Sequence, residues 1–587
     1  MGIILISNRI RIILILSSVF SFALLTYALL IISINPCNGY ELSIYSSTQI
    51  IYWIAIIIGL LDGILLIVHS IFVEDTKLWI AGIIEIVLCN VTVISLYALR
   101  GYVSYMPRGD TLTYIGMAKD INIYGFVPDY NFYPIVSILI AQINQLSSLP
   151  LLLISRYLQI AFYVLYSIFI CLWARALINK RNFVLSTFLA STPLFFAWFM
   201  PSIYHQMLSV MILPLFFYLI HHNYDMNYRY LIVILCIAYP FWHPILAVFF
   251  GIYLTVWFFT EMFDKKLINI VSSLSSKHVS LSMISLYVVT LLAWFINQYQ
   301  IVRSVTSTIL PVVNSLKVSS ATEAGYFAGK LGFFSAIKSL FIMINDELIY
   351  YILSFILIYI SIKHSSLYAR KYFFPIINCL ILGSFSLILI FFLADIHGPY
   401  RLINLDFNVI FAIPLVGLLL FETFEEKSRI KIILLLFLIL IASFSSIISI
   451  YPSQLEMRPN DYGTQKDLAS INWLIFAKDP GFKTADILSP INRYADLIYG
   501  FNYRLNRTDL YRDLDLPDHF GFKGNNIFPI DNNRYLMITT FDIKSYTEIW
   551  EQIHRFEKAD FDEVNYCTNV MKLYENGDCR FYLINKS

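Results

Sequence analysis

Charged residues are scarce in this chain: Asp, Glu, Lys and Arg make up 14% of its 587 residues, against roughly 25% in an ordinary soluble domain. Hydrophobic residues make up 58%, and the mean hydropathy is +0.69. Several windows exceed the ~18 apolar residues that mark a membrane-spanning helix. The chain is therefore expected to cross a membrane many times. It has no long Lys/Arg run and a net charge of +2, so no nucleic-acid partner is expected.

Cysteine is also rare, with seven residues scattered along the chain and no pair spaced for a metal site. Cys567 and Cys579 lie outside the apolar runs and would pair in an oxidising compartment. No glycine-rich phosphate loop of the Walker type is present, which argues against ATP-driven pumping. Few acids lie inside the apolar segments, Asp62 and Glu85 being the main exceptions. This distribution favours chemistry on a lipid-attached substrate over transport.

Thirteen apolar segments are predicted to span the membrane. They are centred on 10–33, 48–71, 77–99, 151–176, 183–200, 205–222, 228–241, 243–262, 279–300, 338–362, 373–394, 402–421 and 429–450. With this count the short basic loops, such as Lys180-Arg181 and Lys265-Lys266, all fall on one side. That side is predicted to be cytoplasmic, together with the N-terminus. The agreement requires 131–147 to be a helix lying on the outer surface instead of a further span.

The outer side then holds the loops 100–150 and 301–337 and the tail 451–587. The tail contains no segment able to span a bilayer. Three stretches in it, 485–490, 534–541 and 579–586, are predicted to be strands, and 545–559 is predicted to be a helix. The expected fold class is a polytopic α-helical membrane protein with a C-terminal extracytoplasmic α/β domain. Its parts are two leading helices (1–76), a transmembrane catalytic region (77–450) and the soluble domain (451–587).

The stretch MPRGDTLTYIGMAKDI, 106–121, follows directly on a predicted span. Its apolar residues, among them Tyr114 and Met117, have helical spacing from Asp110 onward, which predicts an amphipathic helix on the membrane surface. Two interpretations of Asp110 are open. It is either the N-cap of that helix or a carboxylate that accepts a proton from a substrate hydroxyl. Asp120 is a second acid, and the two together are candidates for binding a divalent metal.

A second candidate site is ADIHGPYRLINLD, 394–406, at the outer end of two predicted spans. Arg401 is interpreted either as an anchor to lipid headgroups or as a ligand for phosphate oxygens, which its planar fork suits. His397 lies beside it. His243 lies at a predicted helix break between Trp242 and Pro244. It is interpreted as a packing residue or as an assistant to a leaving phosphate.

Taken together, this layout resembles the GT-C superfamily of membrane glycosyltransferases, most of all its prokaryotic, including archaeal, members. The resemblance rests on RGD at 108–110, NFYPI at 131–135, FWHP at 241–244 and HGPYRLINL at 397–405. It implies a GT-C-like fold and a donor sugar carried on a polyprenyl phosphate or diphosphate. It also implies Asp110 as general base and Arg401 as phosphate clamp. His243, His397 and Arg108 become further substrate-binding residues.

Two features depart from the superfamily pattern. The WWDxG signature of oligosaccharyltransferases is absent, and only NDYG is found at 460–463. The usual paired acid is also missing at Asp110, where the chain continues Asp-Thr-Leu. No cofactor is therefore predicted beyond the divalent metal considered above.

The leading hypothesis is transfer of a sugar, with inversion, from a lipid-linked donor to a glycan, lipid or protein acceptor at the outer face of the cell membrane. The first alternative is a polymerase or ligase for surface polysaccharide. The second is a flippase or transporter for lipid-linked sugars. A membrane scaffold with an outer binding domain is the third.

Overall fold

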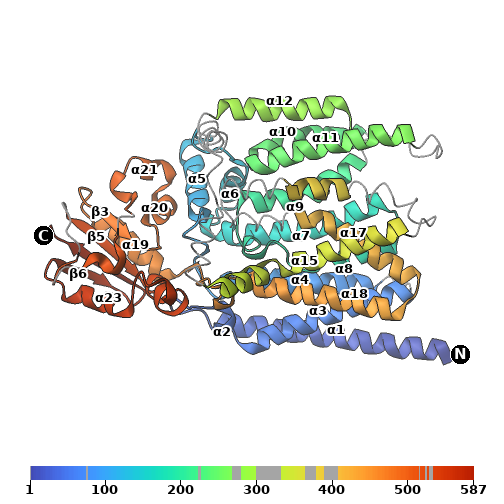
Figure 1. The fold of residues 1–587 in the computed structure, drawn as a ribbon, viewed down its shortest axis with the longest axis horizontal. Coiled ribbons are helices and arrows are strands. Elements are labelled where there is room, and N and C mark those ends of the chain that lie inside the picture. Colours follow the sequence, from blue (N-terminus) through green and yellow to red (C-terminus); the bar gives the residue numbers. More distant parts are fainter. Residues whose placement is uncertain are drawn as a thin grey trace.

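The computed structural model describes most of the chain. The described residues are 2–73, 77–221, 226–267, 279–298, 332–363, 379–388, 408–513, 516–522, 525–527 and 533–586. Most of them are helical and form a long bundle, and the C-terminal residues form a lobe at one end of it (Figure 1). The N-terminus lies at the opposite end of the bundle (Figure 1).

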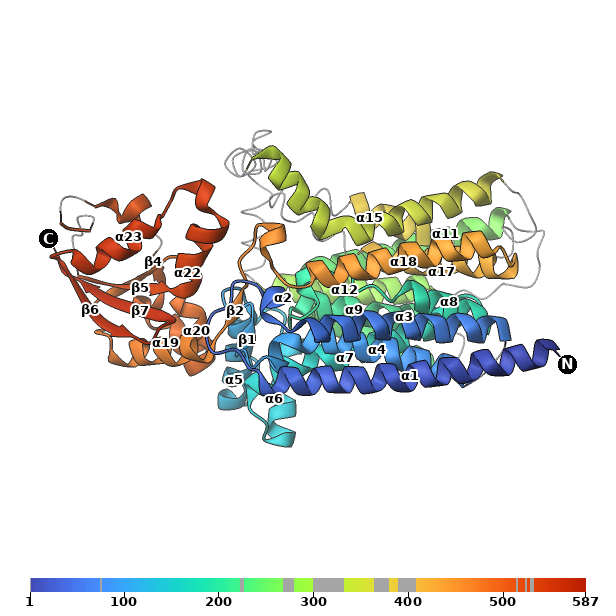
Figure 2. The same cartoon turned by 90° about the horizontal axis from the view of Figure 1, so that it is seen from below.

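Six helices in the described part of the chain are long and apolar enough to cross a membrane. They are α1 (Gly2–Ile34), α3 (Ile50–Val73), α4 (Leu78–Leu99), α7 (Leu151–Leu177), α15 (Phe333–Lys363) and α18 (Arg429–Ser449). They run along the long axis of the molecule (Figures 1 and 2). Large apolar side chains face outward from them; Leu16 of α1 and Ile433 of α18 are 63% and 68% exposed. Such a surface is unfavourable in water and suits lipid, which is the character of a membrane protein.

Further helices complete the bundle. They are α8 (Arg181–Ala190), α9 (His205–His221), α10 (Met226–Ala238), α11 (Pro244–Leu267), α12 (Leu281–Asn297) and α17 (Val409–Glu425). The predicted break at 241–244 is confirmed. A short 3₁₀ turn covers Tyr239–Phe241, and α11 begins at Pro244 because proline is tolerated at the first helical position but not within a helix.

The predicted span 183–200 is wrong as a single helix. α8 ends at Ala190, three residues before Pro193, and proline disfavours helical backbone in the residue before it. Phe196 and Ala197 then adopt left-handed backbone, with φ of 81° and 41°. Another predicted span, 373–394, lies largely outside the described residues; its described part, 379–388, is helical.

Two helices at the end of the bundle lie next to the C-terminal lobe. α5 (Thr111–Tyr124) runs crosswise to the bundle helices (Figure 1). α6 (Ile135–Ser147) confirms the helix predicted within 131–147. The polar side of α6 is turned toward α5, where Asn122 donates to Asn144 at 2.8 Å and accepts from Gln145 at 2.9 Å. α5 forms the surface on which helices of the C-terminal domain rest, and α6 packs against α5.

A two-stranded sheet connects the loop that follows α4 to the start of the C-terminal domain. β1 (Ser104–Tyr105) pairs antiparallel with β2 (Tyr462–Gly463). The ring of Tyr462 packs 4.7 Å from that of Tyr102 and 5.3 Å from that of Tyr105, between ring centroids. The segment that follows α4 and the segment that follows α18 are thus held side by side.

The C-terminal domain contains a five-stranded mixed sheet in the order β4-β3-β5-β7-β6. Its strands are β3 (Lys483–Asp486), β4 (Arg512–Asp513), β5 (Arg534–Thr539), β6 (Val570–Glu575) and β7 (Cys579–Ile584). Its α-helices in the described residues are α19 (Gln465–Ala477), α20 (Ile491–Tyr499), α21 (Phe501–Leu505), α22 (Thr540–Lys544) and α23 (Lys558–Glu563). The strands predicted at 534–541 and 579–586 are confirmed. The one predicted at 485–490 begins two residues earlier and ends at Asp486.

The helix predicted over 545–559 is wrong. A π-helical turn covers Ser545–Ile549, a 3₁₀ turn covers Glu551–Ile553, and His554 has left-handed backbone with φ of 53°. The Trp550 Nε1–H donates to the Met457 carbonyl at 2.8 Å, a contact with the segment that leaves the bundle. The periodicity of apolar residues predicted a continuous helix here, but the backbone is broken where this tertiary contact forms.

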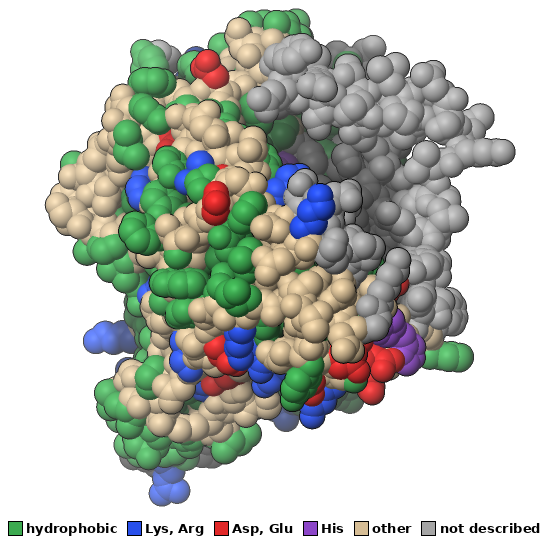
Figure 3. Space-filling view, turned by 90° about the vertical axis from the view of Figure 1, so that its left-hand side faces the viewer, with side chains coloured by type: hydrophobic (Ala, Val, Ile, Leu, Met, Phe, Trp, Pro, Cys, Tyr) green, Lys and Arg blue, Asp and Glu red, His purple; other side chains and the backbone are tan. Residues whose placement is uncertain are grey.

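The surface of this domain that faces away from the bundle is mixed. Lys, Arg, Asp and Glu side chains lie there among smaller hydrophobic patches (Figure 3), as on a water-exposed surface. Inside the domain, Cys567 and Cys579 are free thiols, so the pairing predicted for an oxidising compartment is not formed. The Cys579 Sγ instead donates to Asp467 at 3.4 Å.

Candidate functional site

The three residues of the RGD stretch have three different neighbours. The Arg108 side chain points into the C-terminal domain, where its Nε donates to Ser489 at 3.0 Å and its Nη1 pairs with Asp461 at 3.0 Å. Its guanidinium also lies 3.5 Å from the centroid of the Phe541 ring. These contacts give Arg108 a role in docking the domain, and the substrate contact predicted from the sequence stays a prediction.

Gly109 lies against Tyr204, in the segment just before α9. A Cβ at position 109 would overlap the Tyr204 hydroxyl. Glycine is required here for a close approach of the loop between α4 and α5 to the bundle. The loop is therefore fixed on both sides of Asp110, by Gly109 before it and by α5 after it.

Asp110 occupies the N-cap position of α5, but its side chain makes no capping hydrogen bond. Its Oδ1 instead pairs with Nη2 of Arg493 at 2.5 Å, and the two side chains are 43% and 27% exposed. The interpretation of Asp110 as only a helix cap is therefore wrong. The carboxylate is turned to an open site and to a cation from a distant part of the chain.

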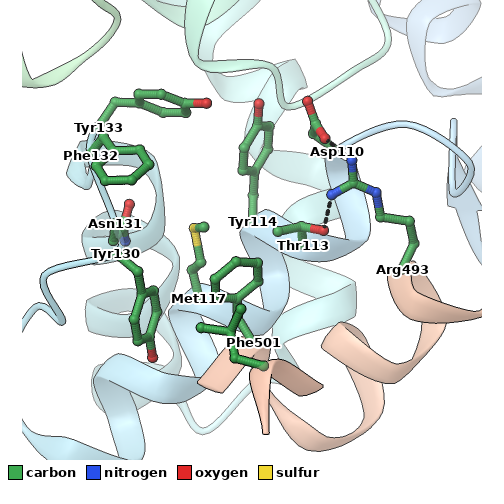
Figure 4. Close-up of a pocket in the computed structure, with 11 residues that line it drawn as sticks. Asp110, Thr113, Tyr114, Met117, Tyr130, Asn131, Phe132, Tyr133, Arg493 and Phe501 are labelled. Carbon is green, nitrogen blue, oxygen red and sulfur yellow. Dashed lines mark hydrogen bonds and ion pairs between the residues drawn. The ribbon is translucent and has the colours of Figure 1, made fainter. Parts of the chain in front are cut away.

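Arg493 belongs to α20 and is held by a chain of hydrogen bonds that leads into the C-terminal domain. Its Nη1 donates to Thr113 Oγ1 at 2.7 Å (Figure 4), and that hydroxyl donates to Asp496 at 2.6 Å. Asp496 also accepts from Arg504 Nε at 2.8 Å. Burial raises the pKa of Asp496, and the bonds from Arg504 and Thr113 oppose that rise. The cation beside Asp110 is thus positioned by a buried network.

Two glycines allow α20 and α21 to lie directly on α5. A Cβ on Gly116 would overlap the backbone carbonyl of Asp496. Gly500, with φ of +96°, lies where a Cβ would overlap the Asp120 carboxylate. The Lys119 ammonium donates to the carbonyl of Ile498, which adds a polar contact to the same interface.

A cavity of about 220 Å³ lies where α5, the loop before α6, and α20–α21 meet. Its lining residues are Asp110, Thr113, Tyr114, Met117, Tyr130, Asn131, Phe132, Tyr133, Arg493, Phe501 and Leu505. Figure 4 shows Asp110, Thr113 and Arg493 at one end, which we call the charged end. Tyr130, Asn131, Phe132 and Tyr133 lie at the other, which we call the neutral end (Figure 4). Both the segment between α4 and α6 and the C-terminal domain contribute to this cavity.

Histidines lie behind the aromatic wall of the cavity. The His243 ring is 5.7 Å from that of Tyr133, between centroids. The His205 ring, at the start of α9, is 4.1 Å from that of Tyr114 and 4.9 Å from that of Tyr133. His243, predicted as a substrate-binding residue, is thus placed behind a lining side chain. His205 likewise packs against two lining tyrosines, Tyr114 and Tyr133.

Asp120 lies on the same helix as Asp110 and ten residues further on, an axial rise of about 15 Å. Its Oδ2 accepts from the Tyr130 hydroxyl at 2.6 Å and from the Asn502 amide at 2.9 Å. The prediction that Asp110 and Asp120 share a metal ion is therefore wrong. Among the described residues, no three His, Cys, Asp or Glu side chains are grouped for a metal. Asp120 instead positions Tyr130 and the start of α21.

Arg401 and His397 lie outside the described residues, so their roles as phosphate clamp and substrate-binding residue stay predictions. The guanidinium that does meet Asp110, that of Arg493, was not predicted. Its segment, INRYADLIYG, has the character of a soluble-domain helix, and its sequence gives no signal that it packs against α5. Asn131 was also missed, although NFYPI was singled out. Asparagine is common in turns, so its presence in this loop does not by itself indicate a binding residue.

The chain matches no protein-family model and no curated protein.

Proposed function

We propose that this chain is a GT-C-like membrane glycosyltransferase with thirteen spans, a cytoplasmic N-terminus and an extracytoplasmic C-terminal domain. It would move a sugar from a polyprenyl-phosphate donor to a glycan, lipid or protein acceptor. One observation supports this most. The partly exposed Asp110 carboxylate lines a cavity where one end of an apolar bundle meets a domain with a mixed, water-facing surface. A donor could react there while its hydrocarbon tail stays in the bilayer.

In this proposal Asp110 is the general base. It accepts the proton of an acceptor hydroxyl while that oxygen bonds to the anomeric carbon of the donor sugar. The bond between the anomeric carbon and the phosphate oxygen breaks, and the phosphate leaves with the electron pair. The new bond forms on the opposite face, which gives inversion. A positioned carboxylate contributes about 10²–10⁴-fold to such a step.

The leaving phosphate needs cations or donors close by, and Arg493 lies beside the proposed base. A guanidinium binds phosphate through paired N–H groups. Its bond to Asp110 is partly solvent-exposed, and such pairs contribute only about 0–1 kcal/mol, so a phosphate can compete for it. Arg401 and His397 keep their proposed role as phosphate ligands, and His243 is proposed to support Tyr133.

The test is sugar transfer by the purified full chain in lipid nanodiscs, with radiolabelled polyprenyl-phosphate sugars as donors. We expect Asp110→Asn to lower the rate by about 10²–10⁴-fold because the base is lost. Its melting temperature should stay within about 2 °C of wild type, since the residue is partly exposed and makes no capping bond.

Asp129→Asn is the matched control, because Asp129 is an exposed acid in the same outer loop that does not line the cavity. It should transfer sugar at the wild-type rate. Wild-type transfer by Asp110→Asn would contradict the assignment of the base. Translocation of lipid-linked sugar without any transfer, unchanged in Asp110→Asn, would favour the flippase alternative.

A further inference from the structure

Asn131 is a buried polar side chain at the neutral end of the cavity. It is 3% exposed, and within the described parts of the chain neither its Oδ1 nor its Nδ2 has a hydrogen-bonding partner. Its own backbone N–H is satisfied by the Pro128 carbonyl at 3.0 Å. Buried amides are nearly always paired, because an unpaired one is unfavourable. An unpaired, buried amide that lines a cavity is typical of a side chain that hydrogen-bonds to a ligand.

The side chains around Asn131 are mainly aromatic. Tyr130, Phe132 and Tyr133 are its chain neighbours in the lining, and Phe501 from α21 packs with its ring 5.0 Å from that of Tyr130. Aromatic rings offer flat apolar faces, which suit the C–H faces of a sugar ring. An amide offers one acceptor and two donor hydrogens, which suit neighbouring hydroxyl groups.

Charge and size narrow the ligand class. The charged lining residues, Asp110 and Arg493, pair with each other at the far end of the cavity. A carboxylate or phosphate placed at the neutral end would therefore be desolvated without a counter-charge among the lining residues. The cavity volume of about 220 Å³ is below the ~300–1,000 Å³ typical of sites for drug-sized ligands, so it suits a single ring.

From this geometry we infer that the neutral end is a subsite for one uncharged sugar ring, and that Asn131 is its specificity-determining residue. The inference rests on the proposed function and names the part of the substrate that this end binds. Asn131 hydrogen-bonds sugar hydroxyls, and the aromatic residues cover the faces of the ring. The reacting atoms then lie toward Asp110.

The first measurement is sugar binding by the full chain in nanodiscs, detected by saturation-transfer NMR. The probes are methyl glucopyranoside, galactopyranoside and mannopyranoside, with cyclohexanol as a ring that lacks the sugar hydroxyls. At least one glycoside should bind wild type. Asn131→Leu, which keeps the side-chain size and removes the amide, should weaken that binding at least about tenfold.

The second measurement is thermal unfolding, with Asn122→Leu as the matched control. Asn122 is an amide of the same outer region with both side-chain groups paired, to Asn144 and Gln145. We expect Asn122→Leu to lower the melting temperature by about 2–6 °C and to keep sugar binding. Asn131→Leu should melt at or above the wild-type temperature, because no existing bond is lost.

The subsite is overturned if no glycoside binds wild type, if Asn131→Leu binds it equally well, or if Asn131→Leu melts as low as Asn122→Leu. The last result would assign the amide a structural role. Neither measurement uses a donor or turnover. If wild type binds a glycoside but transfers no sugar in the donor assay, the proposed transferase function is contradicted and the subsite is not. If Asn131→Leu transfers sugar at the wild-type rate, the subsite is contradicted and the proposed transferase function is not.

Discussion

Asp110 and Asn131 stand at opposite ends of one cavity, and their surroundings differ in kind. At the charged end, Asp110 pairs with Arg493, which is tied through Thr113 to the buried Asp496 and Arg504. At the neutral end, the Asn131 amide has no partner in the described residues. Substitutions behind the charged end should therefore affect stability and function together. Substitution at the neutral end should affect function alone.

The largest effect on stability is expected from Asp496→Ala, which removes the buried carboxylate that links Thr113 to Arg504 behind the charged end. Arg504 would be left buried without its partner, and breaking a buried pair in this way costs about 3–5 kcal/mol. The C-terminal domain should unfold at lower denaturant concentration, as measured by intrinsic fluorescence. Transfer should fall as Arg493 loses its anchor.

The control for Asp496→Ala is Glu575→Ala, which removes an exposed partner of Arg580 and Lys572 on the β6–β7 hairpin. Exposed pairs contribute about 0–1 kcal/mol, so stability and transfer should both stay near wild type. Equal effects of the two variants would show that the Asp496 network does not couple the domain to the cavity.

A smaller effect on stability is expected from Arg493→Ala, which removes the cation of the charged end. Stability should change by no more than about 1 kcal/mol, because the ion pair with Asp110 is partly solvent-exposed. The KM for the lipid-phosphate donor should rise about tenfold, since a charged hydrogen bond to phosphate is lost. Arg493→Lys should recover only part of this affinity, because it keeps the charge and loses the fork.

Methyl glycoside binding at the neutral end should be unchanged in Arg493→Ala. Loss of glycoside binding together with donor affinity would show that the two ends are not separate. An unchanged donor KM would remove Arg493 from the phosphate site.

The smallest effect is expected away from both ends, at His519. Its Nδ1 lies 2.9 Å from Asp560, and the hydrogen bond to that carboxylate raises the pKa of His519 above 6.5. A raised histidine pKa stabilises the fold below the unfolded pKa, and that stability is lost as pH rises through the folded value. The side chain is 46% exposed, so the contribution is small.

His519→Gln should therefore melt about 1 °C below wild type at pH 6 and equal it at pH 8.5. Sugar transfer should be the same as wild type at both pH values. A difference in melting temperature that grows with pH would contradict the direction of the shift.

Sequence reasoning succeeded where local signals decide the structure. Short runs of apolar residues in the C-terminal tail located β5 and β7. The two prolines located the break before α11, and helical spacing located the start of α5 at Asp110. Each of these depends on neighbours within a few residues.

Prediction from the sequence failed where segments that are distant in the chain come into contact. Arg493 reaches Asp110 only because Gly116 and Gly500 let α20 and α21 lie on α5, and no local pattern encodes that docking. The helix predicted over 545–559 is broken where Trp550 contacts Met457. The unpaired state of Asn131 is likewise a property of packing, since its letter alone does not show whether a partner is near.

The most direct measurement is a cryo-EM structure of the full chain in nanodiscs with a non-hydrolysable prenyl phosphonate sugar. We expect ligand density in the cavity, with the sugar ring beside Asn131 and Tyr130 and the phosphonate near Arg493. A ligand bound elsewhere on the bundle, with the cavity between α5 and α20 unchanged, would contradict it.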